Sequence, residues 1–327
     1  MRSPAWYSQS KYIDSKESFH MADKVSIFDF NEDNSRNIYL HGLNDILKEI
    51  FLSLGGPVKT SKQLGFKYTK TKEWLSGRKP ISILDLRKVL RLLSFETSLS
   101  YIQRIDGSKL LLSCRYSSAK ILIPKHIDAD LAYLVGILMG DGSLSGSSSN
   151  KIGNWTIRAF FDNLQHQKIF DSILKAKFNV SPGFSDPPKG CTVSYCCSRV
   201  VHSFFTDLFE VCNGFKCDKI YVPDRVWKSD SKVQFAFIQG LFDSDGTFTK
   251  GSIKYSTTSK KMSGDVQKLL GANGFNFSVN VWIKDKKYLP LYTISIKSKK
   301  SKNLFYELIN FRHPNKKILL EKYIKAP

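Results

Sequence analysis

The sequence predicts an α+β protein in which two similar domains follow one another behind an all-α amino-terminal module. Three observations predict this class. The chain has 327 residues, which is too long for one ordinary compact core. The last two-thirds of the chain contains one pattern twice, with paired strands between amphipathic helices. The first third contains short helical segments separated by glycine and proline.

Residues 1–40 are expected to be a flexible leader, because they begin with scattered charges and lack the apolar segment of a secretory signal. Residues 41–95 form the expected helical module. Its pattern indicates a first helix, a short helix that ends at Gly65, a second short helix at residues 68–76, and a longer helix after Pro80.

The helical module is strongly basic at its centre. Between Lys59 and Lys79 lie seven basic residues and one acid, Glu73. The segment resembles the helix-turn-helix of the Cro/repressor type, whose packing and turn positions are filled here by Leu64, Gly65, Trp74 and Gly77. The resemblance implies that residues 68–76 enter the DNA major groove, with DNA-contacting side chains from Lys67, Lys70, Lys72 and Arg78. A plain helical bundle with a basic face is the alternative interpretation.

Residues 96–127 are expected to be a β-rich linker, because residues 99–105 and 109–114 read as strands. The two repeated domains then occupy residues 128–230 and 231–327.

Two segments in these domains align residue by residue. DLAYLVGILMGDGSL occupies residues 130–144, and QFAFIQGLFDSDGTF occupies residues 234–248. The aligned pairs include Gly136 with Gly240 and Asp141 with Asp245. A strand, an amphipathic helix, an alternating strand and a further helix follow each segment. Two similar halves in one chain predict a pseudo-two-fold molecule, which suits the near-symmetry of duplex DNA.

Each aligned segment predicts a helix that is apolar nearly all round and therefore buried. Small residues recur four positions apart on both helices, at Gly136, Gly140, Gly240 and Ser244. Such residues let two helix backbones approach closely. An Asp-Gly pair then follows each helix, and we expect the glycine to end the helix with a positive φ.

If the two helices pack about the pseudo-two-fold axis, Asp141 and Asp245 emerge side by side. Two adjacent carboxylates at helix carboxyl ends are costly unless a cation lies between them. Because the available ligands are oxygens, a hard ion such as Mg²⁺ is favoured.

The motifs GILMGDG and GLFDSDG resemble those of the LAGLIDADG (dodecapeptide) homing endonucleases of the two-motif, monomeric type, and the resemblance extends over residues 129–323. It implies two tandem αββαββα domains whose sheets form a saddle in the DNA major groove. It also implies a site-specific double-stranded DNA endonuclease with a long asymmetric target. Such an enzyme hydrolyses phosphodiester bonds with Mg²⁺, and Mn²⁺ is expected to substitute.

By position in the motifs, the resemblance assigns the metal ligands to Asp141 and Asp245, with Gly140 and Ser244 beside them. Asp243 is at most secondary. A catalytic lysine near the end of each repeat corresponds to Lys219 and to Lys316 or Lys317, although surface or phosphate-contacting lysines are the alternative. Asp162 and Thr257 or Thr258 are candidate water-holding residues. Further DNA contacts are expected from Arg158, Lys254, Lys284 and Lys297.

The net charge of +21 fits a polyanionic partner. A non-cleaving nucleic-acid-binding protein, either a transcription regulator or an intron maturase, remains the alternative on the same fold. No apolar segment is long enough to span a membrane, and an intracellular location is expected.

Five of the six cysteines lie at residues 191–217, where a strand with cysteine as a small apolar residue is favoured over a zinc site.

Overall fold

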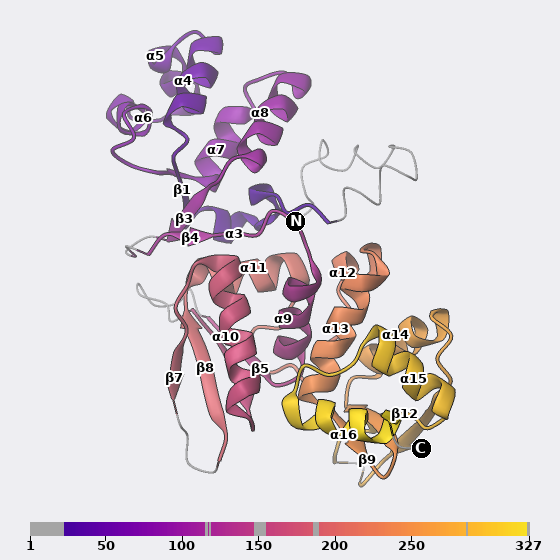
Figure 1. Ribbon diagram of the computed structural model, residues 1–327. Coiled ribbons are helices and arrows are strands. Elements are labelled where there is room, and N and C mark those ends of the chain that lie inside the picture. Colours follow the sequence, from indigo (N-terminus) through magenta and orange to yellow (C-terminus); the bar gives the residue numbers. More distant parts are fainter. Residues whose placement is uncertain are drawn as a thin grey trace.

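The computed structural model describes residues 23–114, 117, 119–146, 155–185, 190–285 and 287–325. These residues form three four-stranded antiparallel sheets. One sheet belongs to the amino-terminal module, and each half of the remaining chain contains another. In Figure 1 the module lies above the first half, and the second half lies beside the first.

The first half has the order helix, two strands, helix, two strands, helix. Its elements are α9 (Ala129–Met139), β5 (Gly142–Ser145), β6 (Thr156–Phe161), α10 (Leu164–Phe178), β7 (Gly183–Ser185), β8 (Thr192–Cys197) and α11 (Arg199–Phe209). The strands lie in the order β5-β6-β8-β7. A short helix, α12 (Asp224–Lys228), leads into the second half.

The second half repeats this order and adds one helix. Its elements are α13 (Ser231–Ser244), β9 (Gly246–Thr249), β10 (Ser252–Thr257), α14 (Lys260–Ala272), β11 (Ser278–Trp282), β12 (Leu291–Ile296), α15 (Lys299–Leu308) and α16 (Pro314–Lys325). The strand order β9-β10-β12-β11 corresponds position by position to that of the first half. The predicted pair of αββαββα domains is confirmed.

Helix starts are specified in the same way in both halves. The carboxylates of Asp128 and Asp230 accept hydrogen bonds from backbone N–H groups of α9 and α13, and Ser198 and Ser298 cap α11 and α15. An oxygen at this position satisfies N–H groups that have no partner within the helix. The residues that cap the helices are therefore repeated along with the rest of the sequence pattern.

Four helices of the amino-terminal module lie where the sequence predicts them. They are α4 (Asn44–Ser53), α5 (Pro57–Leu64), α6 (Tyr68–Leu75) and α7 (Ile83–Leu90), and a fifth helix, α8 (Phe95–Gly107), follows them. The turn after α5 has a left-handed Gly65 with a φ of 67°. Trp74 is buried, with its ring centroid 5.4 Å from that of Phe66.

The expectation of an all-α module is wrong, because the module also contains a small sheet. Its strands are β1 (Ile38–His41), β2 (Ile81–Ser82), β3 (Leu111–Cys114) and β4 (Ile121–Leu122), in the order β2-β1-β3-β4. Ile38 and Leu40 are buried on one face of β1, which is the alternation of a half-buried strand. Since β3 pairs with β1, and β4 pairs with β3, part of the expected linker belongs to the module.

The expected strand at residues 99–105 is also wrong, because that segment lies within α8. The hydroxyl of Ser94 accepts a hydrogen bond from the Thr97 N–H and starts the helix. The strand expected at residues 109–114 is confirmed as β3.

The expectation of a flexible leader up to residue 40 is wrong for its described part, residues 23–40; residues 1–22 lie outside the described residues. We call residues 23–36 the strap. It contains a turn of 3-10 helix, η2 (Ile27–Asp29), and α3 (Glu32–Ser35), and it buries the side chains of Phe28 and Phe30.

The strap binds both to the module and to the first half. The Arg87 guanidinium on α7 donates hydrogen bonds of 2.6 Å to the carbonyls of Phe28 and Phe30. On the opposite side, Asp207 of α11 accepts hydrogen bonds of 2.8–3.1 Å from Asn31 and Asn34. Arg225 of α12 also forms an ion pair with Asp29 at 2.7 Å. The strap therefore fixes the module against the first half.

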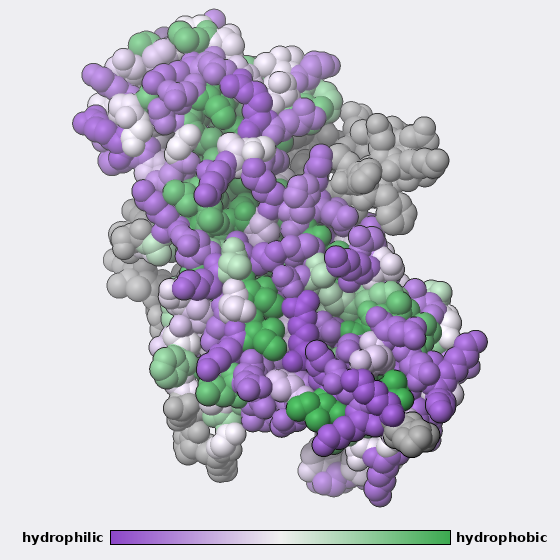
Figure 2. All heavy atoms as spheres, in the orientation of Figure 1, coloured by the Kyte–Doolittle hydropathy of each residue, from purple (hydrophilic) through white to green (hydrophobic). Residues whose placement is uncertain are grey.

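Hydrophilic residues cover most of the face shown in Figure 2, with small apolar patches between them. Among the described residues, no helix is both long enough and apolar enough to cross a membrane.

Candidate active site

The two motif helices, α9 and α13, touch backbone to backbone at their glycines. A Cβ atom on Gly136 would stand 2.3 Å from the Phe237 carbonyl oxygen, and one on Gly240 would stand 2.4 Å from the Tyr133 carbonyl oxygen. A Cβ on Gly140 would overlap the side chain of Ser244. The two helices therefore meet at the small residues that the sequence singles out.

The residue after each motif aspartate must be glycine because a larger side chain would clash with the backbone of the preceding helix. The expected positive φ is wrong, because neither Gly142 nor Gly246 is among the positive-φ glycines of the described residues. Instead, a Cβ on Gly142 would lie 2.4 Å from the Leu138 Cα, and one on Gly246 would lie 2.4 Å from the Phe242 carbonyl oxygen. Each strand therefore starts directly against the last turn of its helix, which directs both preceding aspartates to the same end of the helix pair.

Asp141 and Asp245 lie at that end and are open to solvent. Their closeness follows from the helix contact, because a Cβ on Gly140 would be 3.2 Å from the Asp245 Oδ2. Partial burial, and then repulsion from Asp141, raises the pKa of Asp245 to about 6. Burial likewise raises the pKa of Asp141, against the attraction of Lys316 and Lys216. The two carboxylates repel each other, and a divalent cation bound between them would relieve that repulsion. Their oxygen atoms are the ligands that such a cation prefers.

A lysine occupies the carboxyl end of each motif helix. Lys216 donates hydrogen bonds to the carbonyl oxygens of Leu138, at 3.1 Å, and of Gly140. Lys316 donates to those of Phe242, Asp243 and Ser244, at 3.2, 2.6 and 3.2 Å. Burial lowers the pKa of both lysines, while Asp141 and Asp245 raise it. The two ammonium groups are thus placed symmetrically beside the carboxylates.

The lysines predicted to be catalytic differ in where they lie, and their catalytic role stays a prediction. Lys219 is exposed, whereas Lys216, three residues earlier, donates a hydrogen bond to the Gly140 carbonyl. Of the second pair, Lys316 reaches the site and Lys317 is exposed. The alignment of the repeats gives a partial signal. The spacing from Asp245 to Lys316 differs by four residues from the spacing from Asp141 to Lys216, and by seven from the spacing from Asp141 to Lys219.

The backbone carbonyls beside the aspartates are already engaged. The Gly140 oxygen accepts from Lys216, and the Ser244 oxygen accepts from Lys316. A carbonyl oxygen has two lone pairs, so this leaves a second one at each position. Their role as metal ligands stays a prediction.

Asp243 is a structural residue. It is 2% exposed, and its Oδ2 accepts hydrogen bonds from the Tyr133 hydroxyl and from the N–H groups of Arg312 and His313, at 2.8, 2.9 and 3.1 Å. Burial raises its pKa to about 6. The carboxylate ties the segment before α16 to both motif helices.

Asp162 lies near the same site, directly after β6. Its Oδ1 accepts a hydrogen bond of 2.8 Å from the His313 Nε2, which belongs to the other half of the molecule. The corresponding residue after β10 is Thr258, whose hydroxyl donates to the Cys217 carbonyl at 2.9 Å. The two halves are therefore chemically different beside their aspartates. The other candidate, Thr257, is buried and accepts from the Ser259 N–H.

The predicted sheet contacts with DNA are available to solvent. Arg158 on β6 is exposed and pairs across the sheet with Tyr195, while Lys254 on β10 is half-buried. Lys284 and Lys297 are exposed beside the β11–β12 hairpin.

Of the predicted contacts in the module, Lys67, Lys72 and Arg78 are exposed. Lys70 instead pairs with Asp85 at 2.9 Å, and its ammonium lies 4.9 Å from the Trp74 ring centroid. The positive charge of Lys70 is therefore paired with a carboxylate of the module itself. The helix-turn-helix role of α5 and α6 stays a prediction.

The cysteine segment agrees with the expectation of a strand. β8 contains Cys196, which is buried, and Cys197, which is exposed. In the described part of the chain the cysteines are free, and none belongs to a group with metal-ligand spacing.

Comparison with a family model identifies one region. Residues 232–310 match the model of the LAGLIDADG-like domain. They extend from the start of α13 past the end of α15, and they include the Gly240 and Asp245 positions described above.

Curated relatives match a longer region. The replication factor C small subunit of Methanocaldococcus jannaschii is 28% identical over 215 residues, which cover 62% of this chain and 11% of that protein. The ribonucleoside-diphosphate reductase NrdEB subunit alpha of Bacillus subtilis is 24% identical over 245 residues, covering 63% of this chain and 21% of that protein. The chain thus spans about a tenth to a fifth of the length of these relatives.

Solved structures with a similar arrangement include I-DmoI in complex with DNA and Mn. That structure has a TM-score of 0.45 and 17% sequence identity, covering 56% of this chain and 97% of that chain. Full-length DUF199/WhiA from "Thermatoga maritima" has a TM-score of 0.37 and 15% identity, with 61% of each chain covered.

Proposed function

This chain carries a LAGLIDADG-like domain at residues 232–310, and from that premise we propose that it is a site-specific double-stranded DNA endonuclease. One observation carries the proposal: α9 and α13 pack backbone to backbone and end in two carboxylates, Asp141 and Asp245, that disfavour each other's charge. A bound Mg²⁺ or Mn²⁺ would supply Lewis-acid stabilisation of the attacking and leaving oxygens.

The residues of the chain supply the rest of the chemistry. Asp141 and Asp245 would hold the metal ions. Lys216 and Lys316 place positive charge next to the carboxylates, where a phosphate with growing negative charge is stabilised. Their lowered pKa values reflect burial, which strengthens their interaction with any charge at the site.

The proposed partner is duplex DNA with a long asymmetric target, bound by the monomer. The exposed basic residues of both sheets support this, as does the +21 net charge. The two halves have equivalent folds but different side chains after β6 and β10 (Asp162 and Thr258), which fits a site whose two half-sequences differ.

The proposal is tested with the full chain and a library of long duplexes of random sequence. With Mg²⁺, sequencing of the newly formed ends should give one recurring sequence. Asp141→Asn and Asp245→Asn, which preserve shape but remove charge, should abolish the ends and retain DNA binding. Sequence-selective binding without new ends in Mg²⁺ or Mn²⁺ would favour the non-cleaving regulator or maturase.

A further inference from the structure

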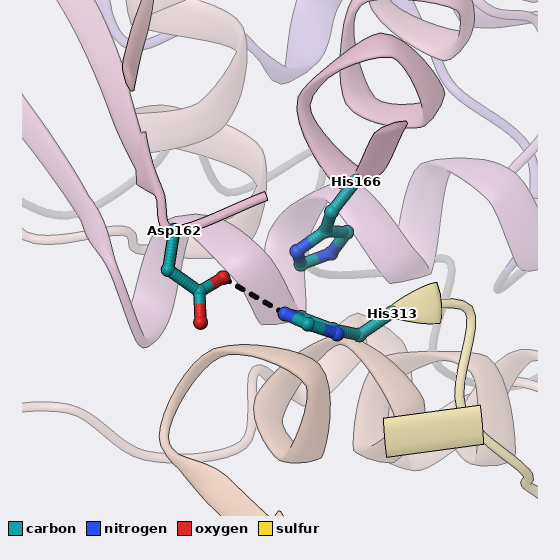
Figure 3. Close-up of side chains that lie close together, drawn as sticks. All are labelled: Asp162, His166 and His313. Atoms are coloured by element: carbon teal, nitrogen blue, oxygen red, sulfur yellow. Dashed lines mark hydrogen bonds and ion pairs between the residues drawn. The ribbon is translucent and has the colours of Figure 1, made fainter. Parts of the chain in front are cut away.

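Three side chains of the types that can bind a metal ion meet beside the carboxylate pair. Asp162 follows β6, His166 lies in the first turn of α10, and His313 precedes α16. One ligand atom from each lies within 4.8 Å of the others. Figure 3 shows the three side chains turned toward one another, and the first two come from one half of the molecule and His313 from the other.

We propose that Asp162, His166 and His313 bind a transition-metal ion of the Zn²⁺ class, at a site separate from Asp141 and Asp245. Imidazole and carboxylate together are the ligands of such ions, whereas Mg²⁺ takes oxygen ligands. The site does not depend on the proposed nuclease activity, and its role is to join the two halves.

The surroundings fix His166 in the form that a metal needs. The Tyr133 hydroxyl has one proton, and it donates that proton to the Asp243 Oδ2 at 2.8 Å. The 2.8 Å bond between that hydroxyl and the His166 Nε2 must therefore be donated by the Nε2–H. The neutral ring then has its free lone pair on Nδ1. Histidines that bind metals are usually oriented in this way, through a hydrogen bond from the other ring nitrogen toward a carboxylate network.

Burial keeps both imidazoles in place. His166 is 3% exposed and His313 is 2% exposed, and their ring centroids are 4.8 Å apart. A neutral imidazole is the state that binds a metal. The Asp162 side chain is 74% exposed and gives an ion access from solvent.

The ligand atoms would have to move for an ion to bind. Ligands about 2.1 Å from a tetrahedral Zn²⁺ lie about 3.4 Å apart. The 2.8 Å hydrogen bond between Asp162 and His313 would open slightly, and the remaining separations, up to 4.8 Å, would close. On binding, the His313 ring proton moves from Nε2 to Nδ1, and water takes the fourth position.

The test uses the full-length chain after EDTA treatment, titrated with ZnCl₂ or CoCl₂ without DNA or Mg²⁺. We expect one ion per chain, a rise in Tm, and the visible absorption band of low-symmetry Co²⁺. Asp162→Asn lies at the surface and should fold, yet it should weaken the binding of Zn²⁺ at least about tenfold. His166→Gln should weaken it further.

Two control variants show whether Zn²⁺ binding belongs to these three side chains. His202→Gln removes a histidine on α11 that is equally buried, at 1% exposure, and should bind Zn²⁺ as the wild type does. The double variant Asp141→Asn, Asp245→Asn should also keep the site. Equal Zn²⁺ binding by the wild type and Asp162→Asn, or loss of binding in the double variant, overturns the proposal. Neither result bears on DNA cleavage.

Discussion

Lys216 and Lys316 each hold the end of a motif helix and face both carboxylates. Unpaired carbonyls give a helix carboxyl end a partial negative charge, so an ammonium there is stabilised. The same ammonium compensates the two aspartates before an ion or a phosphate arrives. Each lysine thus stabilises the carboxyl end of its helix and also compensates the negative charge of the two aspartates.

Replacing these lysines should slow cleavage more than it weakens binding. We expect Lys216→Met or Lys316→Met to lower the single-turnover cleavage rate by about a hundredfold, since that is typical for removing one charge-stabilising donor. Lys219→Met and Lys317→Met are matched controls, because both side chains are exposed. Equal rates for Lys216→Met and Lys219→Met would show that the helix-capping lysine has no part in the chemistry.

The raised pKa of Asp245 predicts a stability effect that depends on pH. Its folded pKa of about 6 exceeds the ordinary 3.8, so ionisation destabilises the metal-free fold as the pH rises through this window. Below pH about 3 the group is mostly protonated in both folded and unfolded chains, and the penalty vanishes. In EDTA, Asp245→Asn should therefore raise Tm by a few degrees at pH 8 and hardly at all at pH about 3. A lower Tm for the variant at pH 8 would contradict the assigned shift.

The two aspartates could be predicted from the sequence because a repeated motif marks them at equal positions. Lys216 could not be identified with equal certainty, since Lys219 lies three residues away and only the fold decides which one reaches the Gly140 carbonyl. His313 has no sequence signal at all. Its partner Asp162 is 151 positions away, and such a pair exists only after the second half has packed on the first.

At the scale of elements, the α9–α13 contact holds the whole site in register. Gly240→Leu should destabilise the fold by more than the 1–3 kcal/mol that is usual for overpacking, because a Cβ would already stand 2.4 Å from backbone. Thermal unfolding measures this effect. Gly264→Ala on α14 is the matched control, since a Cβ there meets nothing within 4 Å, and alanine should stabilise the helix slightly.

The helices of the amino-terminal module also lead to a testable difference between neighbouring lysines. Lys72 is exposed, whereas Lys70 is paired with Asp85. If the module contacts phosphates, Lys72→Gln should reduce the slope of log K against log salt by about 0.9, and Lys70→Gln should change it much less. Equal slopes for Lys72→Gln and the wild type would contradict DNA binding by this face.

The strands of the module illustrate what local patterns miss. β1 and β2 are four and two residues long, so their alternation is too short to distinguish from turns. The isoleucine and tyrosine residues of α8 favour a strand by local preference, and the Ser94 cap and the packing of the helix outweigh that preference.

At the scale of the whole molecule, the division into a module and two repeats follows from the sequence, because each repeat contains the same helix starts and motif. The position of the module does not. The strap helps to set it, because Asp207 binds Asn31 across 176 positions of sequence. No periodicity predicts such a pairing, and a polar segment at the start of a chain normally indicates a flexible tail.

Because the strap fixes the module against the first half, it also fixes the distance along the DNA between the module and the carboxylate pair. If the module and the carboxylate pair touch one duplex, the sequence read by the module must lie a fixed number of base pairs from the cut and on a fixed side. Adding about five base pairs between them rotates that sequence half a turn away, and adding about ten brings it back one turn farther off. We expect the first insertion to remove the contribution of the module to affinity. Asp207→Ala, which removes the hydrogen bonds between the strap and α11, should make affinity less sensitive to the length inserted, as measured by titration of matched duplexes.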